Sequence, residues 1–294
     1  MSSQPHVNLE TTEPPVRRVG SLSPSRASDF MQCPLLFRFR TVDRLPQKPS
    51  PVAIRGTLIH SVLERLFDAP REGRTLAAAL DAVAPEWERL LEAEPEAAEA
   101  VGADVTGWLA SATPLLKTYF ELEDPTRLEP AERELRVECT LADGLVLRGY
   151  VDRLDIAPAN GDMRVVDYKT GKAPREGFEA KAMFQMRFYA LVLWRARGEV
   201  PKLLQLLYLG SGEFLRYEPD EADLLATERK LIAIADRIDK SLTSGEFLPN
   251  KSKLCDWCDH QAICPAWGGT PPPMPVIDAE AVLQSPDTSE PEQE

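Results

Sequence analysis

Hydrophobic residues recur at helical spacing in the first half of the chain and alternate with polar residues in its middle. Helices are predicted over residues 24–40, which begin at a Ser23-Pro24 pair, and over residues 56–67. Two or three more helices are predicted within residues 75–123. The later elements are predicted strands at residues 133–141, 145–156, 163–169, 203–209 and 214–217, and predicted helices at residues 178–197 and 220–244. This order indicates one α/β domain with a central sheet.

The two ends of the chain differ from the middle. Residues 1–20 are polar, rich in proline and without periodicity, and residues 269–294 form a proline-rich acidic tail without an aromatic residue. Such compositions favour disorder. The single domain is therefore expected over residues 21–268, with a helical lobe at about residues 70–125.

With 43% hydrophobic residues among 294, the chain holds enough apolar side chains for a packed core. No apolar run reaches the length of a membrane span, and residues 1–20 lack the basic and then apolar order of a secretory signal. We therefore expect a cytoplasmic protein without a membrane partner. Five unevenly spaced cysteines in such a chain favour metal binding over a disulfide framework.

The formal net charge of −13 argues only weakly against a nucleic-acid partner. Most of the acidic excess lies in residues 81–104 and 278–294, and the rest of the chain is close to neutral. A near-neutral body can carry a local basic groove. Because like charge repels phosphate, both acidic segments are expected to lie away from any nucleic-acid path.

Two predicted strands bring three charged residues together. The first contains Asp152, and the second ends with Asp167 and Lys169. Because side chains alternate along a strand, Asp167 and Lys169 share a face. A two- or four-residue loop within residues 158–161 places Asp152 opposite either Asp167 or Lys169. All three residues lie on one face in both registers.

Two carboxylates and an ammonium on one sheet face are costly to bury unless they serve a site. Carboxylates are hard ligands that suit Mg²⁺ or Mn²⁺. A lysine beside the ion can position an attacking water and offset the negative charge that develops at phosphorus. The alternative is a surface ion pair of Asp167 with Lys169, to which Asp152 is unrelated.

Two predicted helices could complete this site. His60 lies on one of them, with Glu64 a turn later, and Gln185 and Tyr189 project side by side from the other because they are four residues apart. Each feature also has an ordinary explanation, as a core histidine or as a pair of helix-surface residues.

Three cysteines, Cys255, Cys258 and Cys264, form a C-x2-C-x5-C group near the end of the predicted domain, and Cys33 lies far upstream. Four thiolates can hold zinc or an iron–sulfur cluster. Zinc sites usually combine two short Cys/His pairs, and His260 could replace a cysteine in such a site. The arrangement of one cysteine plus three fits a [4Fe–4S] cluster that ties the two ends of the domain together.

Together these residues resemble the RecB-type branch of the PD-(D/E)XK nucleases over most of residues 21–268. Six blocks agree in order and type, which is more specific than any one of them. The blocks are Leu22–Ser25 continuing to Cys33-Pro34, Gly56–His60, Gly149–Asp152, Asp167–Lys169, Gln185 with Tyr189, and the terminal cysteine trio of residues 255–264. The resemblance implies an α/β restriction-endonuclease-like core in which helices flank a central mixed sheet, with an N-terminal helical lobe and a C-terminal iron–sulfur staple.

The resemblance also implies a role for each matched residue. The implied ligands of Mg²⁺ or Mn²⁺ are His60, Asp152, Asp167 and the Tyr168 carbonyl. Lys169 would be the catalytic lysine, and Gln185 and Tyr189 would line the site and contact the DNA strand. As in the AddB nuclease domain and the CRISPR-adaptation nucleases of this branch, the implied ligands of the [4Fe–4S] cluster are Cys33, Cys255, Cys258 and Cys264.

The function implied by the resemblance is that of a metal-dependent deoxyribonuclease, an exonuclease of single strands or DNA ends in repair or recombination. The sequence lacks the G-x-x-x-x-G-K-[ST] motif of an ATP-driven motor, so the chain is expected to be either a stand-alone nuclease or a subunit that works with a separate helicase or repair partner. The alternatives are a catalytically silent iron–sulfur module that binds DNA ends or acts as a scaffold, and a zinc-binding interaction protein. The complete set of Asp152, Asp167 and Lys169 argues against a silent module.

Overall fold

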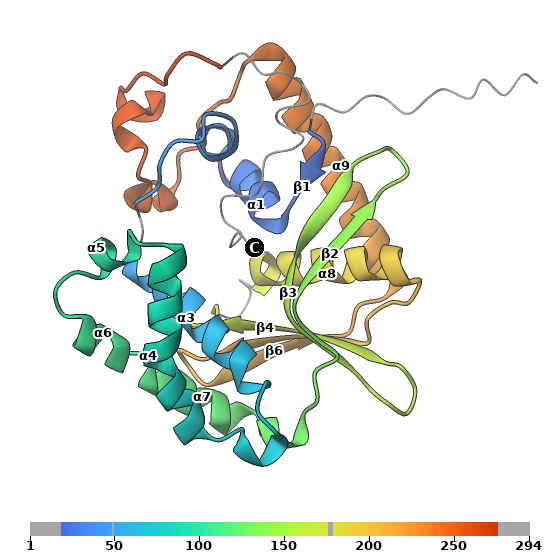
Figure 1. The fold of residues 1–294 in the computed structure, drawn as a ribbon. Helices are drawn as coiled ribbons and strands as arrows, with labels where there is room; N and C mark the ends of the chain where they lie inside the picture. The colour runs from blue at the N-terminus through green and yellow to red at the C-terminus, as the bar shows by residue number, and fades with distance from the viewer. Residues whose placement is uncertain (1–18, 49, 176–178, 276–294) are drawn as a thin grey trace, which may run out of the picture.

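A six-stranded mixed sheet forms the centre of the molecule in the computed structural model, which describes residues 19–48, 50–175 and 179–275 (Figure 1). The strands are β1 Ser21–Leu22, β2 Glu132–Thr140, β3 Val146–Ile156, β4 Met163–Lys169, β5 Leu203–Tyr208 and β6 Glu213–Tyr217. The helices are α1 Pro24–Gln32, α2 Pro34–Phe37, α3 Pro51–Leu66, α4 Leu76–Ala93, α5 Ala97–Val101, α6 Val105–Ala110, α7 Thr113–Leu122, α8 Glu179–Arg197 and α9 Glu221–Ser244. The α/β class and the mixed sheet flanked by helices are as predicted.

Helices cover both faces of the sheet. On one face, α3, α4 and α7 pack against Val166, Tyr168 and Leu207, and we call this layer the helical lobe. On the other, α1, α8 and α9 pack against a core that includes Val165 and Leu204. Neighbouring residues of β4 serve opposite cores because side chains alternate along a strand. The same alternation sends Asp167 toward α8 and Tyr168 toward the lobe.

Strand β3 has different neighbours along its length. β2 pairs with it in antiparallel fashion along one edge, from Thr140 opposite Val146 to Glu132 opposite Leu154. On the other edge, β1 pairs in parallel with the start of β3, and β4 pairs in antiparallel fashion from Arg153 onward. The described pairings leave residues 148–152 without a strand on that edge, which lets other groups approach the backbone of β3.

The prediction of one helix over residues 24–40 is wrong. α1 ends at Gln32, Cys33 is extended with φ −162° and ψ 112°, and α2 begins at Pro34. A proline disfavours the helical conformation of the residue before it, which explains the break. Cys33 therefore lies in a junction between helices, and a π-helical turn at Arg38–Val42 follows α2.

Several predicted boundaries also shift. α3 begins at Pro51 and so is longer than predicted, and residues 75–123 form four helices where two or three were predicted. Val19 is buried and Met274 packs against the core, so the fold extends slightly past residues 21–268 at both ends. The rest of the two segments predicted to be disordered, residues 1–18 and 276–294, lies outside the described residues. None of the described helices is long and apolar enough to cross a membrane.

Candidate active site

The β3–β4 hairpin adopts one of the two registers expected from the sequence. Arg153 pairs with Val166, which places Asp152 opposite Asp167 at the next position. Lys169 follows on the same face as Asp167, and its Nζ lies 2.7 Å from Asp167 Oδ2. The structure therefore brings Asp152, Asp167 and Lys169 together at the end of the hairpin.

Helix α3 adds His60 to this group. His60 Nε2 lies 2.9 Å from the Tyr168 carbonyl oxygen, and His60 Nδ1 lies 3.5 Å from Asp152 Oδ2. The Tyr168 N–H donates to the same Asp152 oxygen at 2.7 Å. If Nε2 donates its proton to the carbonyl, Nδ1 keeps a lone pair directed at Asp152, as a metal-binding imidazole requires.

Glu134, on β2, is a further member of the site that the sequence motifs do not single out. The pairs Arg133–Arg153 and Leu135–Val151 place it opposite Asp152 across the β2–β3 ladder. Its φ of +42° lies in a region that residues other than glycine rarely adopt. Backbone strain of this kind persists where the surroundings enforce it, often at functional sites.

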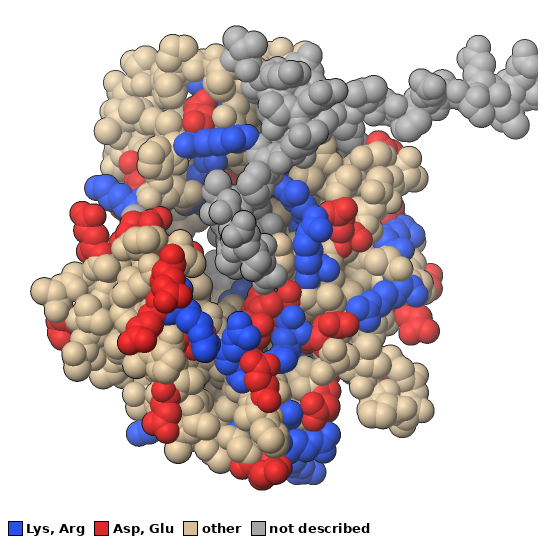
Figure 2. Space-filling view, in the orientation of Figure 1, with Lys and Arg blue, Asp and Glu red and all other residues tan. Residues whose placement is uncertain are grey.

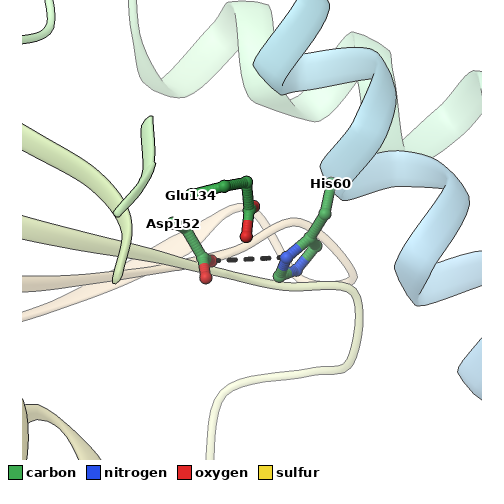
Figure 3. A group of neighbouring side chains, drawn as sticks. All are labelled: His60, Glu134 and Asp152. Atoms are coloured by element: carbon green, nitrogen blue, oxygen red, sulfur yellow. Dashed lines mark ion pairs between the residues drawn. The ribbon is translucent and has the colours of Figure 1, made fainter. Parts of the chain in front are cut away.

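His60, Glu134 and Asp152 form the one described group of three or more potential ligands whose ligand atoms all lie within 4.8 Å of one another. Figure 3 shows them converging from α3, β2 and β3, with the Glu134 carboxylate directed at the His60–Asp152 ion pair. Two carboxylates and an imidazole suit a small divalent cation. The described residues thus provide a candidate acidic metal site.

A chain of hydrogen bonds leads from Lys169 to helix α8. Lys169 Nζ donates to Gln185 Oε1 at 2.9 Å, and Gln185 Nε2 donates to the Tyr189 hydroxyl at 3.1 Å. The structure thus places Gln185 beside the lysine and Tyr189 beside Gln185. In these contacts Gln185 and Tyr189 orient Lys169, and Tyr189 itself is buried.

Burial dominates the electrostatics of the site. It raises the pKa of Glu134 to about 7, with a further contribution from the Asp152 carboxylate. Burial also raises the pKa of Asp167 to about 6, although the Lys169 ammonium opposes this shift. Burial tends to lower the pKa of His60, but Asp152 and Asp167 outweigh it, so the pKa of His60 rises. Crowded, desolvated acids of this kind are what a bound cation would stabilise.

These shifts predict how the stability of the metal-free protein depends on pH. A carboxyl group with a raised pKa in the folded state stabilises the fold below its unfolded pKa, and that contribution is lost as the pH rises through the folded pKa. The raised pKa of His60 changes the free energy of unfolding in the same direction. Urea unfolding in a chelator should therefore give a lower free energy of unfolding at about pH 8 than at about pH 5. Glu134→Gln should flatten this dependence, and a steeper or unchanged dependence in that variant would contradict the assignment.

Gly149 makes room for Tyr189 on the open edge of β3. A Cβ at residue 149 would lie 2.8 Å from Tyr189 Cε1 and 3.4 Å from Pro24 Cδ. The ring would have to shift, and its hydrogen bond with Gln185 would be lost. The motif glycine is therefore explained by this close approach of a helix side chain to the strand backbone.

Gly149→Ala should consequently cost about 1–3 kcal/mol of stability through overpacking. Misplacement of the Tyr189–Gln185–Lys169 chain should also lower activity by about 10- to 100-fold. Adding Tyr189→Leu should restore stability but not activity. Gly73→Ala is the matched control, because its Cβ would meet only Ala69 Cβ at an ordinary 3.5 Å. Equal effects of the two alanine substitutions would argue against a specific role for Gly149.

The four predicted cluster cysteines line one pocket. Cys33, Cys255, Cys258 and Cys264 contribute to its wall together with Leu36 and Phe39. The Asn250 N–H donates to Cys33 Sγ at 3.3 Å, so the segment before the trio contacts the α1–α2 junction. Burial raises the pKa of the Cys258 thiol, and the other three cysteines add to this shift.

His260 is not among the residues that line this pocket. It is buried, and its ring centroid lies 5.1 Å from that of Phe39. Burial lowers its pKa, as expected for a histidine in an apolar setting. The His260 side chain therefore packs in the core and does not line the pocket, while its backbone hydrogen-bonds the Cys258 thiol.

Comparisons with known proteins indicate the family of this chain. The family model of the PD-(D/E)XK nuclease superfamily matches residues 21–265. The gene 69 protein of Mycobacterium phage D29 is 24% identical over 286 residues, and that of phage L5 is 23% identical over 301 residues. Each alignment covers 83% of this chain and 96% of the phage protein.

The fold is also similar to a solved structure. The crystal structure of a proposed exonuclease from Eubacterium rectale superposes with a TM-score of 0.54 at 13% identity, over 88% of this chain and 94% of that protein. The family match spans the sheet, both helical layers and the site described above. The chain belongs to the PD-(D/E)XK nuclease superfamily.

Proposed function

We propose that this protein is a metal-dependent deoxyribonuclease of the RecB-type branch, an exonuclease that acts on single strands or DNA ends in repair or recombination. One observation carries the proposal. The ligand atoms of His60, Glu134 and Asp152 lie within 4.8 Å of one another, beside an Asp167–Lys169 pair on the same hairpin. A module that only binds DNA would not need ligands and an oriented lysine together.

The donor set fits a divalent cation, Mg²⁺ or Mn²⁺. Glu134, Asp152 and Asp167 would hold it through carboxylate oxygens, and His60 would hold it through a ring nitrogen. The Tyr168 carbonyl lies at the same place, within hydrogen-bonding distance of His60. When bound, such an ion lowers the pKa of a coordinated water and polarises the phosphoryl oxygen of the scissile bond.

The protein's own contribution centres on Lys169. Its Nζ is held between Asp167 Oδ2 and Gln185 Oε1, and the Asp167 carboxylate outweighs burial and raises the pKa of the lysine. The ammonium is therefore charged at neutral pH and fixed in direction. A fixed ammonium can orient the attacking water and stabilise the negative charge that develops on the phosphate.

One observation supports attack at nucleic-acid ends, and a second removes an objection to a nucleic-acid substrate. The protein described as a proposed exonuclease shares this fold. Figure 2 shows Lys and Arg side chains interspersed with Asp and Glu over the described part of this face, so the negative net charge does not make it uniformly acidic. Lys and Arg side chains that lie among acidic residues can still contact a phosphate backbone locally.

The test is digestion of 5′- and 3′-end-labelled single- and double-stranded DNA, with Mg²⁺, Mn²⁺ or a chelator. We expect metal-dependent release of short products from linear single strands, and survival of circular single strands. Cleavage of the circles would replace the exonuclease proposal with an endonuclease. A folded protein that binds Mn²⁺ but cleaves none of these substrates would refute the nuclease proposal and favour the silent DNA-binding module.

We further propose that Cys33, Cys255, Cys258 and Cys264 hold a [4Fe–4S] cluster with a structural role. The four thiols line one pocket, and the Asn250 N–H donates to Cys33 Sγ, so the distant Cys33 lies close to the segment of the C-terminal trio. Four thiolates on one site suit a [4Fe–4S] cluster.

A further inference from the structure

Arg153 is a fully buried arginine on β3, directly after the site residue Asp152. Its side chain lies on the face of the helical lobe, where its guanidinium carbon is 5.7 Å from the centroid of the Phe67 ring and 5.6 Å from that of the Tyr168 ring. A buried charge of this kind requires compensation by partners. Those partners connect the lobe to the site.

The first partner is Glu123, the residue that follows α7. Arg153 NH1 donates to Glu123 Oε2 at 2.8 Å and NH2 donates to Oε1 at 2.9 Å, a two-pronged ion pair. Asp155 Oδ1 lies 3.1 Å from Arg153 Nε. The two hydrogen bonds to Glu123 thus fix the guanidinium plane, and the Asp155 carboxylate adds a second negative charge beside it.

The second partner is Tyr168. Arg153 NH1 donates to the Tyr168 hydroxyl at 2.7 Å, and the tyrosine ring packs edge-on against Tyr119 of α7, with centroids 5.8 Å apart. The backbone of Tyr168 lies in the active site, where its N–H binds the Asp152 carboxylate and its carbonyl binds the His60 ring. One residue therefore has its side chain held by Arg153 and its backbone groups in contact with two proposed metal ligands.

We propose that Arg153 and Glu123 are positioning residues that fix Tyr168 and, through its backbone, set the orientation of Asp152 and His60 toward a divalent cation. This inference rests on the proposed metal-dependent function. Stability alone is a poor reason for the pair, because hydrophobic residues of similar volume often stabilise a core as well as a buried ion pair does. A guanidinium fixed by two hydrogen bonds to Glu123 can hold the phenol in one direction, which an apolar side chain cannot do.

The chain contains a matched comparison. Arg74 is another buried arginine of the lobe, paired with Glu129, and it also lies against the Phe67 ring, at 5.2 Å. Its other described partners are the backbone carbonyls of Ala69, Leu128, Pro125 and Phe67, which all belong to the lobe and its connection to β2. Arg74→Lys should therefore lower stability as a buried ion-pair variant does, without affecting the metal ligands.

The decisive variant is Tyr168→Phe, which keeps the ring and removes only the phenol contact. Electron paramagnetic resonance of free Mn²⁺ would measure metal binding to the DNA-free protein, independently of catalysis. We expect Tyr168→Phe, Arg153→Lys and Glu123→Gln each to weaken Mn²⁺ binding by about 10-fold or more, as is typical for groups that orient metal ligands. The KM for DNA should stay within about twofold, and Arg74→Lys should bind Mn²⁺ like the wild type.

Coupling gives a second readout. Because Arg153 acts through the Tyr168 hydroxyl, the effects of Arg153→Lys and Tyr168→Phe on the Mn²⁺ dissociation constant should be less than additive in the double variant. Wild-type Mn²⁺ binding by folded Tyr168→Phe would overturn the inference, even if Arg153→Lys failed to fold. A wild-type protein that binds Mn²⁺ normally but cleaves no DNA would instead refute the proposed function and leave the positioning role to be decided by the same titrations.

Discussion

Replacement of Lys169 by alanine should lower the rate of DNA cleavage by about 100- to 10,000-fold, the range typical for loss of a group that stabilises charge or transfers a proton. Its ammonium lies 2.7 Å from Asp167 and is oriented by Gln185 at 2.9 Å. Asp167→Ala should be at least as damaging, because it removes both a proposed metal ligand and the counter-charge of the lysine.

Loss of Lys169 should also weaken metal binding, and the experiment must separate this effect from the loss of the ammonium in catalysis. The lysine opposes the burial that raises the pKa of Asp167, so Lys169→Ala should raise that pKa further and weaken metal binding near neutral pH. Measurements at about pH 8 with saturating Mn²⁺ would restore the ionised carboxylate. A large loss of kcat should persist there, because it reflects the missing ammonium.

Lys202→Ala is the control for this experiment, since Lys202 is exposed and its ion pair with Glu218 spans 3.8 Å. Exposed pairs of this kind contribute little to stability. Its cleavage rate should match that of the wild type. A folded Lys169→Ala protein that cleaves DNA at the wild-type rate in saturating metal would refute the role proposed for this lysine.

The part of the site that follows from local sequence could be predicted. Alternation alone places Asp167 and Lys169 on one face, and the parity of the hairpin brings in Asp152 without knowledge of the exact register. The four-residue spacing of Gln185 and Tyr189 places them together on α8. What these patterns could not provide was the direction of the contacts, in which Gln185 holds Lys169 and Tyr189 fills the space beside Gly149.

Glu134 shows where prediction from sequence ends. Its place opposite Asp152 depends on the β2–β3 register, which the connecting residues 141–145 set, and on a backbone φ that no residue preference indicates. The one signal in the sequence was an acidic residue in the predicted strand that directly precedes the motif strand along the chain. The burial of Arg153 could not be predicted from the sequence either. An arginine after a motif aspartate normally suggests an exposed or DNA-facing cation, whereas Arg153 is fully buried.

The prediction of a single first helix over residues 24–40 was wrong for a different reason. Helical periodicity continues through Cys33, but Pro34 imposes an extended conformation on it, and this local constraint prevails over the pattern. The break has a consequence for the cysteines. It places Cys33 in a junction that contacts Asn250, whose side-chain amide also donates to the Gln32 carbonyl at 2.8 Å.

Cys33→Ala should therefore produce the largest loss of stability among the variants considered. A cluster that joins Cys33 to Cys255 closes a loop with 221 intervening residues. By the chain-entropy relation for disulfides, such a closure stabilises the fold by about 5 kcal/mol, although its entropic origin is model-dependent. Substitution of any one of the four ligands should remove the cluster and this closure, and activity should fall only as far as folded protein is lost.

Cys139→Ala is the matched control. Cys139 lies on β2, and burial raises the pKa of its thiol to about 11, so it is a poor metal ligand near neutral pH. After anaerobic purification, the wild type and Cys139→Ala should contain iron and sulfide and show visible absorption that bleaches on reduction, and both should resist protease more than Cys33→Ala. Stoichiometric zinc without sulfide would refute the cluster. An intact cluster in Cys33→Ala would refute the connection between the two ends of the fold, since three thiolates close in sequence would then suffice.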